Sequence, residues 1–168
     1  VGRINNLKNV FFIVSSLAKI KELSPKLDFK MFFIGTGQDE EELKRRIKNY
    51  HLENNVIMCG KITDRNLLAS YYARSDLFLF PSLYDASSIV QIEAASQKLP
   101  TLFLKGAATT STVTNDVNGF ISDNDVSLYA QKIIDIINNP QKLQEVGENA
   151  YRDLYQTWDE RIKEVYDM

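Results

Sequence analysis

LFLFPSLYDASSIVQIEAAS, residues 77–96, is the stretch of sequence that decides the fold. Its first four residues are all apolar, which predicts a short buried strand, and Pro81-Ser82 ends that strand. A loop of small, mostly polar residues follows. Ser88 and Gln91 then have the spacing of a capping box, so a helix is expected over 88–97. A buried strand that leads through a polar loop into a helix is the repeating unit of a parallel α/β sheet.

The rest of the chain continues this alternation. Further strands are expected at 29–34, which is apolar enough to be buried on both faces, and at 56–58, 101–104 and 120–121. Further helices are expected at 7–23, 39–50, 64–73 (capped by Thr63 or Asp64), 126–138, 141–156 and 159–166. The pattern predicts one α/β domain, residues 1–168, around a doubly wound parallel sheet. Ligands bind such sheets outside the carboxyl ends of the strands, here the loops at 35–38, 59–63, 81–88 and 105–112.

Composition excludes several classes of protein. The single cysteine, Cys59, rules out an internal disulfide, and one cysteine with one histidine cannot form a structural zinc site. A net charge of −2 gives no indication of a nucleic-acid partner. No apolar run approaches the roughly 20 residues that span a bilayer, and no signal peptide is recognisable. The opening Val1-Gly2-Arg3 has no lead-in, so we interpret the chain as a fragment of a larger protein.

The first group of candidate residues lies around the start of the helix at 88–97. Amides of Ser87, Ser88 and Ile89 would project from its positive end and form an anion site, unless Ser88 simply caps the helix. Glu93 has apolar neighbours on nearly every side, so we expect it to be buried, where a carboxylate requires a partner. That partner is either a hydroxyl of a bound sugar or ribose, or a structural group such as a loop amide or a basic side chain. Asp85 lies in the loop near the same helix end.

The second group is at the amino terminus. Gly2 permits a close approach of the backbone, and Arg3 and Lys8 flank the start of the first helix. The two cations have the chemistry to clamp a diphosphate, although two solvated surface cations are the commoner arrangement. Gly35-Thr36-Gly37 lacks the third glycine of a dinucleotide fingerprint, which favours a plain strand-to-helix turn.

An ordered set of short motifs runs along the chain: GR at 2–3 with KN at 8–9, FIGTG at 33–37, NVI at 55–57, GKI at 60–62, ARSDLFLFPS at 73–82, LPT at 99–101, NGF at 118–120 and WDE at 158–160. Together they resemble the C-terminal domain of the family 4, or group 1, glycosyltransferases, which have two facing Rossmann-like domains. The resemblance covers essentially the whole chain. In that family a Glu-x7-Glu motif follows the Pro-Ser, and here it reads Asp85-x7-Glu93.

The resemblance implies a retaining hexosyltransferase whose donor is a nucleotide-diphosphate sugar, a UDP-hexose above all. Arg3 and Lys8 would bind the donor diphosphate and stabilise the departing phosphate. Asp85 would contact the transferred sugar, and Glu93 would bind the ribose hydroxyls. The loop at 60–62 would hold the base. The remaining implied donor-binding residues are Gly2, Gly35, Gly60, Lys61, Ile62, Leu67, Ser87, Ser88 and Ile89.

The resemblance also implies the protein's partners. No metal or other cofactor is required, because cations and helix amides do the work of a metal. A glycan or lipid acceptor would bind the missing N-terminal domain, so the isolated chain should lack transferase activity. The full-length protein would be cytoplasmic, with peripheral association at the inner face of the membrane, and would bind no nucleic acid.

Several positions depart from the family pattern. Asp85 replaces a glutamate, residues 86–88 replace Gly-Phe-Gly, Gln97-Lys98 replaces Cys-Gly, and residues 107–111 lack an acidic residue. These changes leave open the alternative that the chain is a catalytically degenerate binding module. A sugar-nucleotide epimerase of the same architecture is the third alternative, and it would need its own catalytic carboxylates and a partner histidine, which cannot be placed in this sequence.

Overall fold

The computed structural model describes residues 1–85 and 89–155. The strands are β1 (Met31–Ile34), β2 (Val56–Gly60), β3 (Phe78–Phe80), β4 (Thr101–Leu104) and β5 (Phe120–Ser122). The α-helices are α1 (Val10–Leu23), α2 (Glu40–Asn49), α3 (Arg65–Arg74), α4 (Ile89–Ser96), α5 (Val126–Ile137) and α6 (Pro140–Leu154), and 3-10 turns occupy Asn6–Lys8 and Ala108–Thr110. None of these helices is long and apolar enough to cross a membrane. The helix expected at 159–166 falls outside the described residues.

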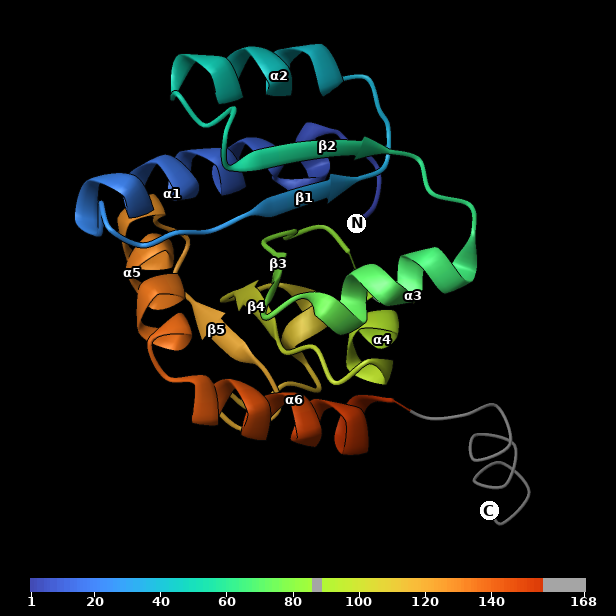
Figure 1. The fold of residues 1–168 in the computed structure, drawn as a ribbon. Helices are drawn as coiled ribbons and strands as arrows, with labels where there is room; N and C mark the ends of the chain where they lie inside the picture. Colours follow the sequence, from blue (N-terminus) through green and yellow to red (C-terminus); the bar gives the residue numbers. More distant parts are fainter. Residues whose placement is uncertain (86–88, 156–168) are drawn as a thin grey trace.

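All described strand pairs are parallel, which confirms the predicted α/β class (Figure 1). The strands, however, form two separate sheets, β1-β2 and β3-β4-β5, rather than the one sheet that was expected. Phe78 lies opposite Thr101, and Leu102 lies opposite Phe120, so β5 is the predicted edge strand. No described strand connects β1 to β3, and this break is the main difference between the expected and observed topology.

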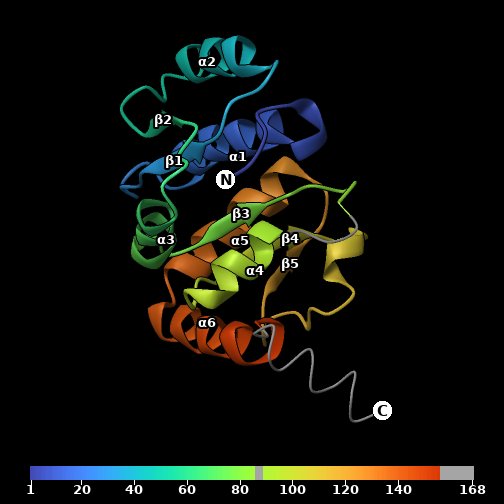
Figure 2. The ribbon, with the colours of Figure 1, turned by 90° about the vertical axis from the view of Figure 1, so that its right-hand side faces the viewer.

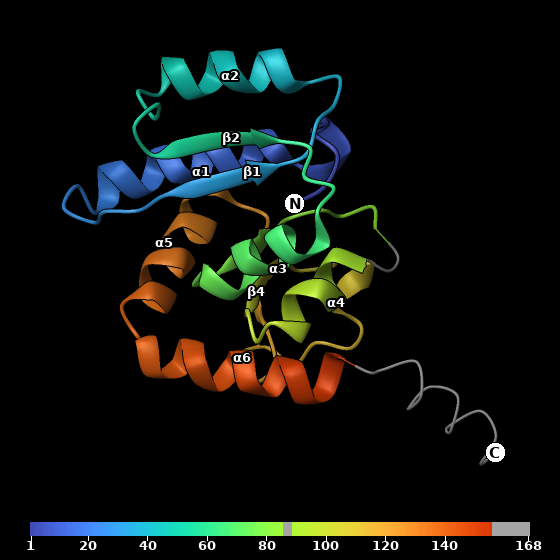
Figure 3. The same cartoon turned by 45° about the vertical axis from the view of Figure 1, so that its right-hand side comes forward.

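Helices cover both faces of the three-stranded sheet, as a doubly wound fold requires. Leu102 and Leu104 of β4 belong to the apolar cluster built with α1 and α5, whereas Phe103 belongs to the cluster built with α3 and α4. Successive side chains of a strand point to opposite faces, so β4 is buried along its whole length. Figures 1 and 3 show α5 on one side of this sheet and α4 on the other.

The expected strand at 29–34 is shorter and less buried than the sequence indicated. Only Met31–Ile34 is a strand, and Phe32 is 37% exposed, so burial on both faces is wrong for this strand. Phe33 points into the cluster with α1, while Phe32 contacts the Tyr71 ring edge-on, with 5.6 Å between ring centroids.

The helix expected at 7–23 is interrupted near its start. Asn9 has a φ of 57°, which is left-handed backbone, and it separates the 3-10 turn at 6–8 from α1. Asparagine tolerates this conformation better than most residues, because its short polar side chain can hydrogen-bond locally. The side chain of Asn5 accepts a hydrogen bond from the Lys8 amide at 3.1 Å and closes the turn. The 3-10 turn therefore does not continue the axis of α1, and Lys8 belongs to the turn and not to that helix.

Two glycines after β1 let the amino-terminal backbone pack directly against this loop. The amide of Gly2 donates to Ile34 O at 2.9 Å, and that of Ile4 donates to Thr36 O at 3.0 Å. A Cβ on Gly35 would lie 1.8 Å from Gly2 O, and one on Gly37 would lie 2.1 Å from Ile4 O. Both positions must therefore be glycine for this approach, which fixes residues 2–8 at the carboxyl end of β1.

We predict that Gly35→Ala lowers the free energy of unfolding by about 2–4 kcal/mol, because the new methyl group meets the Gly2 carbonyl and the backbone is strained. Gly106→Ala is the matched control: Gly106 also has positive φ, 85°, but its Cβ would enter open space. That control should lose only about 1 kcal/mol. Urea unfolding at pH 7 measures both values, and equal losses would contradict the packing role of Gly35.

Candidate functional site

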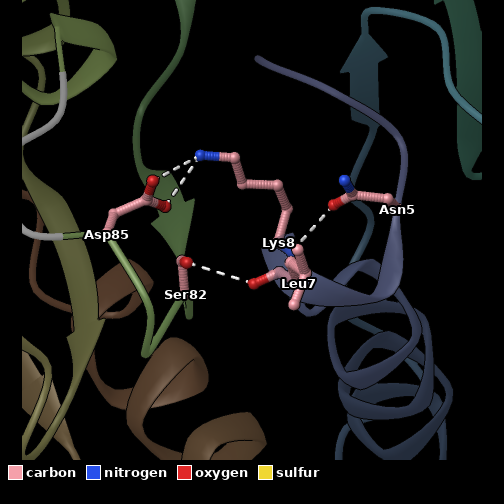
Figure 4. Close-up of polar contacts among 5 residues, drawn as sticks. All are labelled: Asn5, Leu7, Lys8, Ser82 and Asp85. Atoms are coloured by element: carbon pink, nitrogen blue, oxygen red, sulfur yellow. Dashed lines mark hydrogen bonds and ion pairs between the residues drawn. The ribbon is translucent and has the colours of Figure 1, made fainter.

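An ion pair joins the amino-terminal turn to the carboxyl end of β3. Lys8 Nζ lies 2.6 Å from Asp85 Oδ1 and 2.8 Å from Oδ2, so it donates to both carboxylate oxygens (Figure 4). The two residues are 77 positions apart in sequence. Their side chains are 30% and 22% exposed, respectively. The structure thus brings together two of the three residues for which catalytic roles were predicted.

Two hydrogen bonds and one cation–ring contact hold the amino-terminal turn against β3 and the loop that follows it. Ser82 Oγ donates to Leu7 O at 3.2 Å, as Figure 4 shows, and Asn9 Nδ2 donates to Pro81 O at 3.1 Å. Lys8 Nζ also lies 5.8 Å from the centroid of the Phe80 ring. The position of Lys8 is therefore set by the turn itself and not only by its partner carboxylate.

The ion pair sets the protonation of Asp85. Burial acts to raise the pKa of this carboxyl group, but the hydrogen bond and the charge of Lys8 outweigh it, so the pKa lies below the ordinary value of 3.8. Asp85 is consequently an anion at neutral pH. Its negative charge is balanced by Lys8 before any ligand arrives.

Glu93 lies on α4 with its side chain 27% exposed, so the expectation that it is buried is wrong. Its carboxylate has a structural partner: Tyr72 of α3 donates its hydroxyl to Oε2 at 3.1 Å. Arg65 Nη1 is 3.9 Å from Oε1, and the Arg65 side chain is 90% exposed. Burial, and secondly the charge of Glu93, raise the pKa of Tyr72, which keeps this hydroxyl a donor. Sequence reasoning missed Tyr72, because two adjacent tyrosines in a helix carry no functional signal.

Gly2 and Arg3 lie beside the ion pair. Gly2, Arg3 and Lys8 line one small cavity of about 30 Å³, together with Val1 and Phe80. The Arg3 side chain is exposed, and within residues 1–85 and 89–155 it forms no ion pair. Glu93 does not line this cavity, so the structure groups the two predicted diphosphate-binding cations and leaves Glu93 on the neighbouring α3–α4 face.

The remaining candidates lie at the carboxyl ends of β1 and β2 and at the starts of two helices. Gly35 donates its amide to Gly60 O at 2.8 Å, which ties these two strand ends together. Lys61 is exposed and Ile62 half-buried, and Leu67, 49% exposed, lies in the first turn of α3. Ile89 begins α4 and is 75% exposed. Ser87 and Ser88 lie outside the described residues.

No group of three or more histidine, cysteine, aspartate or glutamate side chains in the described part of the chain is placed to hold a metal ion.

Among the described residues, every buried side-chain nitrogen or oxygen has a hydrogen-bond partner with one exception, Thr109 Oγ1, in the 3-10 turn after β4. The main chain of this residue accepts a hydrogen bond from Gln91 of α4 at 3.4 Å. The loop after β4 is therefore tied to α4, on the same side as the other strand-end loops.

Residues 1–153 match the family described as glycosyl transferases group 1. The chain belongs to this family. One curated relative is N-acetyl-alpha-D-glucosaminyl L-malate synthase of Bacillus anthracis, which is 23% identical over 169 residues. The alignment covers 99% of this chain but 43% of that protein, so the chain spans less than half the length of its relative.

Solved structures share the fold, among them that of a glycosyl transferase group 1 family protein. The C-terminal domain of LpcC from Francisella tularensis has a TM-score of 0.80 at 22% identity, over 92% of this chain and 81% of that domain. A mutant of S. aureus TarM, in complex with fondaparinux, α-GlcNAc-glycerol and UDP, has a TM-score of 0.84 at 20% identity, over 98% of this chain and 34% of that chain. The predicted Rossmann-like fold and family are therefore confirmed for this group 1 glycosyltransferase chain.

We predict that Asp85→Asn lowers the free energy of unfolding by up to about 1 kcal/mol at pH 7, because it removes a partly exposed ion pair. The folded-state pKa of Asp85 lies below 3.8, so the pair's contribution is present above pH 3.8 and is lost as the pH falls through the folded-state value. Urea unfolding from pH 7 down to pH 3 should show the difference from the wild type shrinking in the acid range.

Asp123→Asn is the control for this comparison, since Asp123 pairs with Lys105 at 3.4 Å where both side chains are more than half exposed. It should change stability little at any of these pH values. The described ion pair would be contradicted if Asp85→Asn and the wild type had the same free energy of unfolding at pH 7, or if the difference between them grew as the pH fell.

Proposed function

We propose that this chain is the donor-binding part of a retaining hexosyltransferase, with a UDP-hexose as its donor. The observation that carries the proposal is the placement of Lys8, held by the amino-terminal turn at the carboxyl end of β3 beside Arg3 and Asp85. Parallel α/β sheets bind their ligands at this edge. The UDP in the solved TarM complex supports a nucleoside diphosphate as the ligand.

Lys8 has the capacity to bind a phosphate without releasing Asp85. An ammonium group carries three N–H donors, and the Asp85 carboxylate takes two of them. The third donor, with the guanidinium of Arg3, is available to diphosphate oxygens. As the bond from sugar to phosphate breaks, negative charge grows on the departing phosphate, and fixed cations stabilise that transition state more than the ground state.

Asp85 and Glu93 have separate proposed roles. Asp85 is held by Lys8 as an anion and would accept hydrogen bonds from hydroxyls of the transferred sugar. Glu93 Oε2 accepts the Tyr72 hydroxyl, and its remaining lone pairs would accept hydrogen bonds from the ribose hydroxyls. The backbone at 60–62, with Leu67 nearby, would hold the base, and the amides at the start of α4 would face the donor.

In the whole protein, an additional domain would bind a glycan or lipid acceptor. The relative in Bacillus anthracis is named for a product that joins N-acetyl-glucosaminyl to L-malate, which supports considering small acceptors as well. We propose that the reaction uses no metal, because Lys8 and Arg3 would neutralise the diphosphate. We propose a cytoplasmic protein that associates with the inner face of the membrane.

A non-catalytic binding module is the second candidate. It is favoured by the altered loop at 107–111, where the Thr109 hydroxyl is buried without a partner among the described residues and the family's acidic residue is missing. Turnover of a UDP-sugar by the full-length protein would eliminate this candidate. Analysis of the product's anomeric configuration in the same experiment tests retention, and release of free UDP with an epimerised sugar would indicate an epimerase.

We predict that Lys8→Ala weakens UDP binding about tenfold or more and leaves uridine binding unchanged, because only the diphosphate contacts the ammonium. Glu93→Ala should weaken UDP but not 2′,3′-dideoxy-UDP, which lacks the ribose hydroxyls. Calorimetry on the isolated chain measures all four affinities. Lys132→Ala is the matched control, because Lys132, on α5, also pairs with an aspartate, Asp116, at 2.9 Å. If Lys8→Ala lost equal affinity for UDP and for uridine, the proposed role of Lys8 in diphosphate binding would be refuted.

We predict further that the isolated chain transfers no sugar, because the acceptor site would belong to another domain. Incubation with UDP-glucose or UDP-N-acetylglucosamine and a panel of glycan and lipid acceptors should release no UDP above the protein-free blank. The full-length protein under the same conditions is the positive control. Acceptor-dependent UDP release by residues 1–168 alone would contradict this prediction.

A further inference from the structure

The hydroxyl of Tyr72 is a polar group at the edge of an apolar cluster. Tyr72 lies near the end of α3, is 3% exposed, and packs its ring edge-on against Phe78, with 5.8 Å between ring centroids. The other buried members of this cluster are Phe80, Ala94, Leu99 and Phe103. A phenylalanine ring would fill the same volume in the cluster, so the hydroxyl needs an explanation of its own.

The partner of this hydroxyl is a carboxylate on the next helix. Tyr72 donates to Glu93 Oε2 at 3.1 Å, and this is the only hydrogen bond that its hydroxyl makes among the described residues. Figures 2 and 3 show α3 and α4 next to each other, so the bond connects two helices. Each group needs the other, because a buried hydroxyl without a partner and a poorly hydrated carboxylate are both unfavourable.

The two oxygens of the Glu93 carboxylate have different surroundings. Oε2 receives the hydrogen bond from a buried, closely packed side chain. Oε1 lies 3.9 Å from Arg65 Nη1, and the Arg65 side chain, at the first position of α3, is 90% exposed. An exposed pair at this distance restrains a side chain little. Tyr72, and not Arg65, therefore sets the orientation of the carboxylate.

The orientation matters for a ligand that offers two neighbouring hydroxyls, as ribose does. Tyr72 uses one lone pair of Oε2, which leaves acceptor sites on both oxygens of Glu93. A carboxylate that is already held in one orientation accepts two hydroxyls, one on each oxygen, without losing side-chain freedom when the ligand binds. A glutamate without this support would have to be ordered by the ligand itself.

We propose that Tyr72 is a positioning residue, whose hydroxyl fixes the Glu93 carboxylate and so gives the site its preference for ribonucleotides over nucleotides without ribose hydroxyls. The inference rests on the proposed binding of a nucleoside diphosphate and names the residue that controls selectivity for its sugar. Tyr72 acts through Glu93 and not on the nucleotide, because its ring is buried and its one hydroxyl proton is donated to the carboxylate.

The test measures ribose selectivity, which we define as the Kd for 2′,3′-dideoxy-UDP divided by the Kd for UDP. Calorimetry on residues 1–168 is carried out at pH 8. Burial lowers the pKa of the Val1 amino group to about 6, so at pH 8 this amine is neutral and adds no charge near Glu93. Tyr72→Phe should lower the selectivity at least about threefold, the cost of ordering one glutamate side chain, and should leave the Kd for dideoxy-UDP unchanged.

Tyr129→Phe is the matched control. Tyr129 of α5 is fully buried and donates its hydroxyl to Leu102 O at 3.1 Å, on the opposite face of the three-stranded sheet from Glu93. This variant also removes one buried hydroxyl, so it should lower the Tm but leave ribose selectivity unchanged. Arg65→Ala removes the other neighbour of Glu93 and should change the selectivity less than Tyr72→Phe does.

A double-mutant cycle separates positioning from packing. In a Glu93→Ala background, Tyr72→Phe should leave the Kd for UDP unchanged, because no carboxylate remains to be oriented. Three results would overturn the inference: unchanged selectivity in Tyr72→Phe, equal weakening of both nucleotides in Tyr72→Phe, or a loss of selectivity confined to Arg65→Ala. A wild-type chain that binds both nucleotides equally would refute the ribose-binding role of Glu93 as well, whereas a selective wild type with an equally selective Tyr72→Phe would refute only the role of Tyr72.

Discussion

The backbone contact between Gly2–Ile4 and Ile34–Gly37 is the constraint on which the candidate site depends. Two hydrogen bonds at 2.9 and 3.0 Å hold these segments together, and the absence of a Cβ at Gly35 and Gly37 permits the approach. The contact brings the amino-terminal turn across to the end of β3, where Lys8 meets Asp85. One packing arrangement therefore sets the position of Lys8 at the end of β3.

Charge at the site is arranged in advance of any ligand. Lys8 and Asp85 neutralise each other across elements that the backbone already holds in place, so a phosphate would meet an ammonium whose position changes little on binding. Preorganised groups of this kind stabilise charge without the cost of reorienting solvent or side chains. Glu93 is arranged in the same way, through the Tyr72 hydroxyl instead of a cation. The two carboxylates thus occupy different environments although they lie eight residues apart.

The order of strands and helices could be predicted from the sequence, because buried parallel strands are short apolar runs. The segment with β3, α4 and β4 shows this most clearly, as two apolar runs separated by a helix. Charge and position along the chain, and then the family motifs, singled out Lys8, Asp85 and Glu93 as candidates. The contact between Lys8 and Asp85 could not be predicted in this way, because it joins residues distant in the chain. The sequence could not show the left-handed turn at Asn9, because a single residue's φ leaves no periodicity. Tyr72 was missed for lack of any local signal. The split sheet was missed because strand patterns do not reveal which strands are neighbours.

The partners of the amino-terminal turn lie 72 to 77 residues further along the chain. Contacts of such separation form slowly, because a long loop must close before they contribute. During synthesis the turn leaves the ribosome before β3 and its loop, and it has no contact with them until they have emerged. We therefore expect the edge that holds Lys8 and Asp85 to be among the last parts of the molecule to assemble. Ligand binding at that edge would then indicate that a nascent polypeptide has reached its native tertiary structure, and not merely that its helices have formed.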